Sequence, residues 1–262
     1  MQTMTDTTER RDLPGMAGWA ASVLGLSYLR LFAERLSPAE AGALAKRYAY
    51  VFIYSYDKLN FPGFHVKEQR TGIIDLRQPL EEMFKRFRKN TRNEIRKTER
   101  VPGLELRAPD PDADTSYRLY RHVKTVDDGV IADIRQDFAG CLFFNAYLRG
   151  ELVVSMSCYD SGTTLRLKHI VSRRKERGYD PMLMGAASRR LIWEICRYGE
   201  ARGRAAFDLA GMNVTDPAKR GISAFKESFA PTLATVYTYR YQSTLFTIVK
   251  EVLRRVFRKN IN

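Results

Sequence analysis

One stretch, Leu191 to Phe229, constrains the fold more than any other part of the sequence, because it combines a helix, a strand, a turn and a second helix. Its first part places apolar residues at helical spacing up to two glycines, Gly199 and Gly203. A short apolar run from Ala205 to Leu209 then predicts a buried strand, whose one charged residue is Asp208. Ligands of open α/β sheets gather at the carboxyl ends of strands, so this acid lies where a site is expected.

Three segments before this stretch predict an antiparallel meander. They run from Cys141 to Leu148, from Glu151 to Tyr159 and from Thr163 to Val171, and glycine-containing turns separate them. Further strands are expected at Ala49–Tyr56, Thr71–Leu76, Leu104–Ala108 and Leu233–Tyr241, and helices at Pro79–Glu99, Thr115–Val126 and Met182–Arg202. The chain is therefore expected to fold as an α/β (α+β) protein.

The third strand of the meander has two distinct faces if it alternates regularly. Leu165, Leu167, His169 and Val171 would share one face, and Arg166, Lys168 and Ile170 the other. A histidine on a mainly apolar face is either part of the sheet packing or a general base. The sequence leaves both roles open for His169.

The N-terminal region predicts two helices. Met16 to Leu36 has the apolar content of a helix, although its apolar residues cover too wide an arc for a clean stripe. Ser37, Pro38 and Glu40 then form a helix-start signal, with Ser37 as N-cap and Glu40 closing a capping box. A short second helix should follow to Tyr48.

A formal charge of +14 favours an anionic partner over none. Eight of the sixteen residues from Lys85 to Arg100 are Lys or Arg, which suits a phosphate-bearing ligand or a lipid headgroup, although a solvated charged face is an alternative. The segment Thr244–Lys259 predicts a basic amphipathic helix, which either packs on the protein or lies on an anionic membrane.

A basic loop, Ser172 to Asp180, links the third meander strand to the next helix. It carries four cations and a glycine immediately before the helix begins. Because a helix amino end favours negative charge, this order of strand, basic loop and helix suits an anionic ligand, and a solvated loop is the alternative.

Several classes of chemistry lack their motifs here. The sequence has no P-loop, dinucleotide glycine fingerprint, zinc-ligand spacing or nucleophile elbow. Three cysteines without metal spacing fit a reducing cytoplasm, and no uncharged apolar run reaches membrane-spanning length. We therefore expect no metal site, a cytoplasmic location and a protein that aligns two substrates.

Several local strings, in this order, resemble the FemAB-like branch of the GNAT acyltransferase superfamily. They are IIDL followed by the basic helix KNTRNEIRKTER, the meander, LIWEICRYGEARGRAAFDLAG and AFKESF. The resemblance covers about Thr71 to Tyr241. It implies a mixed, mainly antiparallel sheet flanked by helices, which opens between the strands Thr163–Val171 and Ala205–Leu209. An acyl thioester or aminoacyl ester would enter that gap, and an amine would accept the acyl group.

The resemblance also implies roles for individual residues. Lys226 corresponds to the lysine of the family's Phe-Lys pair, where a fixed cation would stabilise the oxyanion. Asp208 matches the strand-end aspartate, which either accepts the amine proton or organises the turn, and His169 is a second candidate proton acceptor. Residues expected to bind the donor are Arg173, Arg174, Lys175 and Gly178. The segment Lys175 to Asp180 is a partial match to the GNAT pyrophosphate motif. Residues expected to bind substrate are Arg166, Lys168 and Phe225.

Two departures from the family pattern bear on the domain organisation, and the first of them also disfavours aminoacyl-tRNA and a peptidoglycan precursor as the substrate pair. FemAB enzymes carry two tandem domains, whereas only about 70 residues precede IIDL here, and Phe229 is followed by Ala230 in place of the family's glycine. We therefore expect an N-terminal helical extension with a first strand (1–70), an acyltransferase domain (71–241) and a C-terminal helix (242–262).

The expected function is N-acyl transfer from acyl-CoA or acyl carrier protein to an amine of a cell-envelope saccharide, lipid or peptide precursor, in the cytoplasm or at the inner face of the membrane. Two alternatives stay open. One is aminoacyl-tRNA-dependent transfer, with tRNA the less favoured partner, and the other is a noncatalytic module that binds a membrane or carrier protein. The sequence does not specify the oligomeric state.

Overall fold

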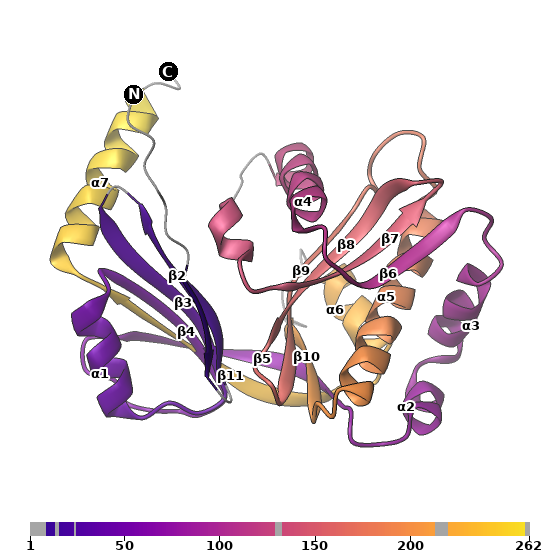
Figure 1. The fold of residues 1–262 in the computed structure, drawn as a ribbon, viewed down its shortest axis with the longest axis horizontal. Coiled ribbons are helices and arrows are strands. Elements are labelled where there is room, and N and C mark those ends of the chain that lie inside the picture. The colour runs from indigo at the N-terminus through magenta and orange to yellow at the C-terminus, as the bar shows by residue number, and fades with distance from the viewer. Residues whose placement is uncertain (1–8, 14–15, 24, 129–132, 213–219, 260–262) are drawn as a thin grey trace. The chain divides into compact units, whose positions relative to one another are not determined.

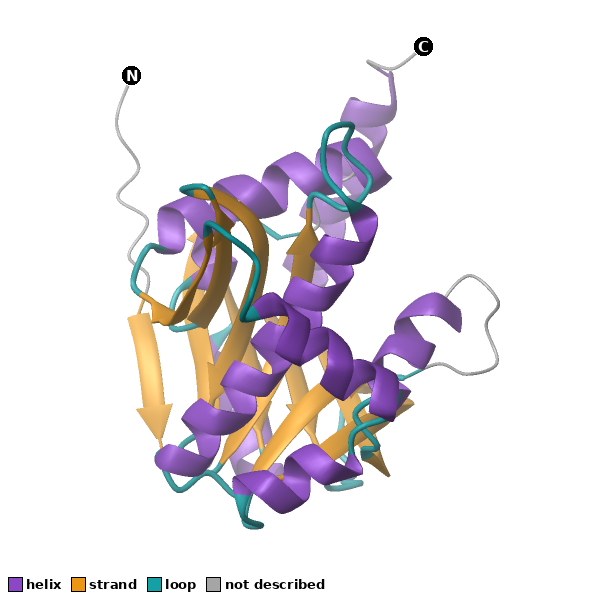
Figure 2. Cartoon of the chain, turned by 90° about the vertical axis from the view of Figure 1, so that its right-hand side faces the viewer, coloured by secondary structure: helices purple, strands orange, loops and turns teal. Residues whose placement is uncertain are grey.

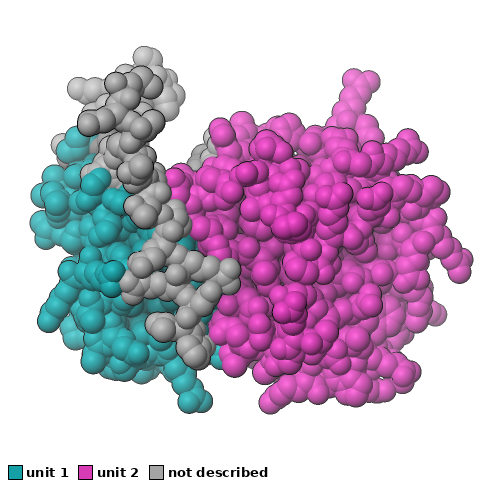
Figure 3. All heavy atoms as spheres, in the orientation of Figure 1, with its two compact units in different colours: residues 1–69, 235–262 teal, residues 70–234 magenta. Residues whose placement is uncertain are grey.

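A computed structural model describes residues 9–13, 16–23, 25–128, 133–212 and 220–259. The chain divides into two compact units, which are coloured separately in Figure 3. Unit 1 comprises Met1–Gln69 and Thr235–Asn262, and unit 2 comprises Arg70–Ala234. The chain passes from one unit to the other within two strands, β5 (His65–Asp75) and β11 (Thr232–Gln242).

Unit 1 is built on strands in the order β1-β2-β3-β4-β11. β3 and β4 are parallel, and the other neighbouring pairs in this order are antiparallel. The elements are β1 (Glu9–Leu13), β2 (Met16–Val23), β3 (Leu26–Ala33), α1 (Pro38–Arg47), β4 (Tyr50–Ser55) and α7 (Thr244–Lys259), together with the unit 1 parts of β5 and β11. The buried core of this unit gathers aromatic and branched side chains such as Tyr239, Ile53 and Leu29.

Unit 2 contains strands in the order β5-β10-β9-β8-β7-β6. Only β9 and β10 are parallel within this order, so the sheet is mixed and mainly antiparallel, which confirms the predicted fold class. Figure 2 separates its strands from its helices by colour. The elements are α2 (Leu80–Arg86), α3 (Lys89–Thr98), β6 (Leu104–Asp110), α4 (Ala113–Asp128), η1 (Arg135–Phe138), β7 (Leu142–Leu148), β8 (Glu151–Asp160), β9 (Thr164–Ser172), α5 (Pro181–Ala201), β10 (Ala206–Gly211) and α6 (Arg220–Glu227).

Two hydrophobic clusters cover the two faces of the unit 2 sheet. On one face, α5 buries Leu191, Ile192 and Ile195 against strand residues such as Phe144 and Phe207. On the other, α4 buries Leu119 and Tyr120 with a second set of strand side chains. Figure 1 shows α2, α3 and α5 grouped on one side of these strands. Alternate residues of the central strands are thus buried on both sides, as their near-continuous apolar sequence predicts.

The helix predicted for Met16–Leu36 is wrong, because this segment forms the hairpin β2–β3 with a turn at Gly25 (φ 75°). Gly18 explains why the segment is stable as a paired strand. A Cβ atom at position 18 would lie 2.5 Å from the backbone oxygen of Arg30 on β3, so only glycine allows this close approach. The poor helical stripe of the sequence agrees with the strand conformation. The N-terminal extension is therefore mainly strand, with α1 as its one described helix.

The single long helix predicted from Pro79 to Glu99 is also wrong, because the chain breaks into α2 and α3 at Phe87 and Arg88. Both residues have extended ψ angles, 144° and 142°. Phe87 is buried against Phe229 with ring centroids 5.1 Å apart, and the Arg88 amide donates to the Ser228 carbonyl over 2.9 Å. Contacts with the end of α6 therefore override the local helical preference.

Other local predictions are confirmed. Ser37 caps α1 and forms the capping box with Glu40, and Pro38 occupies the first turn. The β7–β8 turn uses Arg149 and Gly150 in left-handed conformations, and Gly162 does the same between β8 and β9. Within the described residues, no helix has both the length and the apolar composition to cross a membrane.

Candidate functional site

β9 and β10 pair over only three residues of each strand. Their parallel register joins Thr164–Arg166 to Ala206–Asp208 and stops there, although β9 runs on to Ser172 and β10 to Gly211. A bulge lies on the other side of β10, where Asp208 faces Ile73 of β5 but Gly211 faces Thr71. β10 thus separates from β9 directly after Asp208, at the position where the resemblance implied a gap.

Asp208 lies at the end of this pairing and is fully buried. Its carboxylate accepts hydrogen bonds from the Thr71 hydroxyl, from the Ala210 amide at 2.7 Å and from the Arg166 guanidinium, which also forms an ion pair with it. Arg166 is itself only 3% exposed. Asp208 therefore fixes the turn after β10 and neutralises a buried arginine on the neighbouring strand.

Lys226 of α6 meets the same turn. Its Nζ donates to the Gly211 carbonyl over 2.8 Å, and the side chain is 6% exposed. The pKa of Lys226 is lowered from 10.5 to about 8, mainly by burial; the Asp208 charge opposes the shift and the Arg166 charge contributes to it. The structure thus brings together Lys226, Asp208 and Arg166 from among the residues predicted to form the site.

A β-bulge changes the predicted alternation of β9. Ser157 faces His169 and Cys158 faces Leu167, which leaves Lys168 as the extra residue. Leu165 and Leu167 consequently pack in the α5 cluster, whereas Val171 packs in the α4 cluster. The prediction that Leu165 and Leu167 share a face with His169 and Val171 is therefore wrong, because the bulge reverses the side on which the later residues lie, whereas His169 and Val171 do share the α4 face.

His169 lies among the aromatic rings of the α4 face, against Tyr120 and Phe138 at centroid distances of 4.7 and 5.3 Å. Its Nε2 is 2.8 Å from the Asp133 carboxylate, which also pairs with Lys168 at 3.2 Å. Burial lowers the pKa of His169, with the nearby Lys168 adding to that effect and Asp133 opposing it. The neutral imidazole is thus favoured, with Nε2–H donating to Asp133 and the Nδ1 lone pair available as an acceptor.

Lys168 serves the same local structure. Its ammonium donates to the Asp137 carbonyl and lies 4.6 Å from the centre of the Phe138 ring. It therefore ties β9 to η1 and to the segment that carries Asp133.

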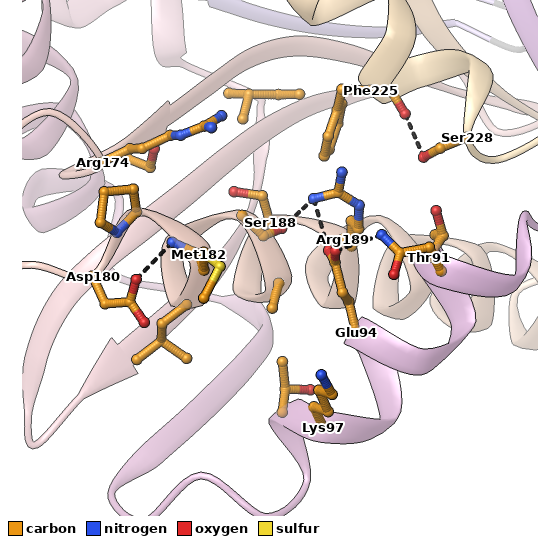
Figure 4. Close-up of a pocket in the computed structure, with 18 of the residues that line it drawn as sticks. Thr91, Glu94, Lys97, Arg174, Asp180, Met182, Ser188, Arg189, Phe225 and Ser228 are labelled. Atoms are coloured by element: carbon orange, nitrogen blue, oxygen red, sulfur yellow. Dashed lines mark hydrogen bonds and ion pairs between the residues drawn. The ribbon is translucent and has the colours of Figure 1, made fainter.

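A cavity of about 1020 Å³ lies in unit 2 between α3, α5 and α6 and reaches the end of β9 (Figure 4). Ile170 and Ser172 of β9 line it, together with Met182 and Leu183 at the start of α5 and Phe225 of α6. Its charged lining has more cations than acids, namely Arg88, Lys97, Arg174 and Arg189 against Glu94 and Asp180. The cavity therefore combines an apolar wall with a net positive charge.

Arg189 is the half-buried cation of this cavity. Figure 4 shows its guanidinium between Glu94 of α3, with which it forms an ion pair at 3.0 Å, and the Phe225 ring, whose centre is 5.2 Å away. Its Nε is buried and has no hydrogen-bond partner among the described residues. Burial lowers the pKa of Arg189, and the charge of Arg174 lowers it further while Glu94 opposes the shift. An anion that enters here would meet two neighbouring arginines.

Of the four cations in the basic loop before α5, one lines the cavity, Arg174. Arg173 instead pairs with Glu176 at 2.7 Å, and Gly178 adopts a left-handed turn with φ 97°. Lys175 is exposed. The amino end of α5 is capped by the Asp180 side chain, which accepts from the Met182 amide. This acidic cap reduces the attraction of the helix end for a second anion.

Four residues of the site were absent from the prediction. Arg189 and Glu94 lie on different helices and form their pair only when α3 packs on α5. Thr71 and Asp133 are remote in sequence from the residues they bind, Asp208 and His169. No local pattern identifies such partners, because the fold alone brings them together.

Comparison with known proteins gives a match in structure but not in sequence. No family model and no curated protein sequence matches the chain. FemX has a similar solved structure, with a TM-score of 0.55, 11% identity and 88% of each chain covered. The C-terminal DUF2156 domain of a protein named as a lysylphosphatidylglycerol synthetase, from Agrobacterium fabrum, gives 0.52 and 11% identity over 92% of this chain and 86% of that one.

A third solved structure is that of a protein assigned to the GNAT acetyltransferases, from Novosphingobium aromaticivorans. Its TM-score is 0.50, with 12% identity over 88% of this chain and 90% of that one. These structural similarities agree with the fold that the resemblance implied, a mixed sheet in which β9 and β10 diverge. The chain has the fold of the FemAB-like and GNAT acyltransferases.

Proposed function

We propose that this protein is an N-acyltransferase that moves an acyl group from a thioester donor, acyl-CoA or acyl carrier protein, to an amine. The observation that carries the proposal is the cationic, partly apolar cavity between α3, α5 and α6, which reaches the part of β9 beyond its pairing with β10. The acceptor that we propose is an amino group of a cell-envelope saccharide, lipid or peptide precursor. We also propose that the reaction takes place in the cytoplasm.

The cavity suits the two parts of such a donor. Arg189 and Arg174 offer charge-assisted hydrogen bonds to a phosphate. Ile170 and Phe225 offer apolar contacts to the chain that links the phosphate to the thioester. The donor would thus extend from the arginines toward the gap between the strands.

The chemistry then needs one proton acceptor and one cation near the gap. His169 lies on the α4 face of the sheet, opposite the α5 face that carries the cavity, so we propose that the amine approaches from the α4 side of the gap. Its nitrogen attacks the thioester carbonyl carbon, and the amine proton passes to Nδ1 of His169, which Asp133 holds in orientation. The C–N bond forms, the C–S bond breaks, and the thiolate takes the proton back from His169. Lys226 is the cation proposed to stabilise the oxyanion of the tetrahedral intermediate.

The other predicted residues have supporting roles in this proposal. Asp208 and Arg166 are positioning residues, because their buried pair holds the turn that Lys226 contacts. Lys168 positions Asp133 through their ion pair. Arg173, Lys175 and Gly178 shape the loop from which Arg174 reaches the cavity.

A second donor class, aminoacyl-tRNA, is favoured by one observation. α3 forms one wall of the cavity, and eight of the sixteen residues from Lys85 to Arg100 are Lys or Arg. Such a density of positive charge in the segment that forms this wall suits a polyanion. The binding experiment therefore includes charged tRNA beside the two thioester donors.

Donor binding by matched variants tests the proposal. The melting temperature of the full chain is measured with acetyl-CoA, a long-chain acyl-CoA, acyl carrier protein and charged tRNA. Binding raises the melting temperature, because the ligand stabilises the folded state. Arg174→Ala should weaken donor binding roughly 10-fold, the loss expected for one charge-assisted contact. Arg177→Ala removes a cation from the same loop but not from the cavity lining, and should leave binding unchanged.

Transfer is then followed with the donor that binds. In the Arg189→Gln variant, incorporation of a labelled acyl group into a panel of amines should fall. The preference among donors should stay the same as in the unchanged protein. If charged tRNA is the one donor that raises the melting temperature, the result would favour an aminoacyl ester over a thioester as the donor. Binding of a carrier protein or membrane without transfer to any amine would support the noncatalytic alternative and contradict the proposal.

A further inference from the structure

The C-terminal helix α7 exposes an apolar face within unit 1. Leu245, Ile248 and Val252 are 58%, 54% and 53% exposed. Their spacing of three and four residues places them on one side of the helix. Three large apolar side chains on one helix face form a patch that a solvated surface does not require.

The same helix is attached to unit 1 through a different residue. The Phe246 ring stacks on Tyr50 of β4, with centroids 5.0 Å apart and planes at 28°. The Ser243 hydroxyl accepts from the Phe246 amide, and the Ser243 amide donates to the Ala49 carbonyl over 2.8 Å. These contacts fix the start of α7 while its exposed residues stay outside the unit 1 core.

The sequence of α7 is strongly cationic. Between Thr244 and Lys259 it has five Lys or Arg residues and one acid, Glu251. A helix with an apolar face and cationic residues is suited to the boundary between anionic headgroups and acyl chains. A second copy of this chain would bring two such cationic helices together, which their mutual repulsion disfavours.

We infer that α7 docks unit 1 on an anionic lipid bilayer, with Leu245, Ile248 and Val252 entering the acyl-chain boundary. The inference does not rest on the proposed acyl transfer, because its residues all belong to unit 1 and the donor cavity belongs to unit 2. Docking and transfer can therefore fail independently.

Vesicle sedimentation of the full chain tests the inference. The protein should sediment with vesicles of phosphatidylglycerol and phosphatidylcholine, at least 10-fold more strongly than with phosphatidylcholine alone, because each Lys or Arg near an anionic surface adds to binding. High salt should weaken the binding. The variant with Leu245→Ser, Ile248→Ser and Val252→Ser should bind roughly 10- to 100-fold more weakly, since it loses three half-exposed apolar side chains.

Two further variants make the result specific. Val66→Ser removes an apolar side chain of similar exposure, 47%, from another part of unit 1, and should bind vesicles as the unchanged protein does. Arg254→Gln with Arg255→Gln keeps the apolar face and should weaken binding to the anionic vesicles, which tests the inference even if the serine variant does not fold.

Three outcomes would overturn the docking. They are no preference for anionic vesicles, unchanged binding of the folded serine variant, and a concentration-dependent dimer that this variant abolishes while vesicles are not bound. Transfer to a soluble amine should be the same in the serine variant, so a loss of docking is distinguishable from a loss of activity.

Discussion

Replacing Lys226 by methionine should make the protein more stable at neutral pH, and this gain should shrink as the pH rises. Lys226 is buried, and its pKa falls from 10.5 to about 8 on folding. At neutral pH the side chain is charged in both the folded and the unfolded states, so folding must desolvate an ammonium group. Methionine has a similar length and no charge to desolvate.

The magnitude follows from the two pKa values. Well below the folded-state value, a shift from 10.5 to about 8 corresponds to a penalty of about 3.4 kcal/mol. As the pH rises from about 8 to about 10.5, the folded state releases the proton before the unfolded state does, and linkage reduces the penalty to about 0.8 kcal/mol near pH 10. Losing the bond to the Gly211 carbonyl subtracts about 1–3 kcal/mol from the gain at every pH.

The difference in unfolding free energy between variant and parent should therefore decrease by about 2.5 kcal/mol from pH 7 to pH 10. Urea unfolding of both proteins across this range measures it, and the pH dependence of all other groups cancels in the difference. Lys97→Met, at an exposed position on α3, controls for the loss of one positive charge. A difference that stays constant across the range would refute the assignment of a depressed pKa to Lys226.

Three further predictions concern the site and its support. The rate of transfer should have a bell-shaped pH dependence. It should rise as His169 loses its proton, at a pH below the ordinary pKa of histidine, and fall near pH 8 as Lys226 loses its proton. A pH-independent rate would contradict both roles. Asp208→Asn should lower the unfolding free energy by about 3–5 kcal/mol in urea, because it leaves the buried Arg166 unpaired. Gly199→Ala should cost about 1–3 kcal/mol in the same assay, since its Cβ would lie 2.5 Å and 2.9 Å from two buried leucine side chains. An unchanged midpoint in either variant would count against the described packing.

The sequence predicts the elements of unit 2 where local patterns and turns agree. The β7–β8–β9 meander follows from its glycine turns, and the α5–β10–α6 unit follows from periodicity. Prediction from the sequence fails where tertiary contacts decide the local conformation. The α2–α3 break depends on Phe87 packing against Phe229, and the β2–β3 hairpin depends on the close approach of Gly18 to Arg30.

The candidate site shows the same division. Asp208 and Lys226 could be proposed as site residues from the strings that resemble the FemAB-like family, because they lie in a recognisable turn and a Phe-Lys pair. Their partners could not, since the Arg166–Asp208 pair spans 42 residues and the His169–Asp133 pair spans 36. The bulge at Lys168 likewise has no sequence signal, yet it decides which face of the sheet His169 occupies.

The order in which unit 1 is synthesised follows from its discontinuous chain. Its first segment ends at Gln69 and its second begins at Thr235, so the ribosome makes all of unit 2 before β11 is available to pair with β4. The Tyr239 hydroxyl, for example, donates to the Asp57 carbonyl across 182 residues. Unit 2 can collapse on contacts within one continuous segment, whereas unit 1 must keep its early strands unpaired with β11 until residues 232–242 have been translated. A stop codon before β11 would thus remove a late strand from unit 1 and leave the sequence of unit 2 almost complete.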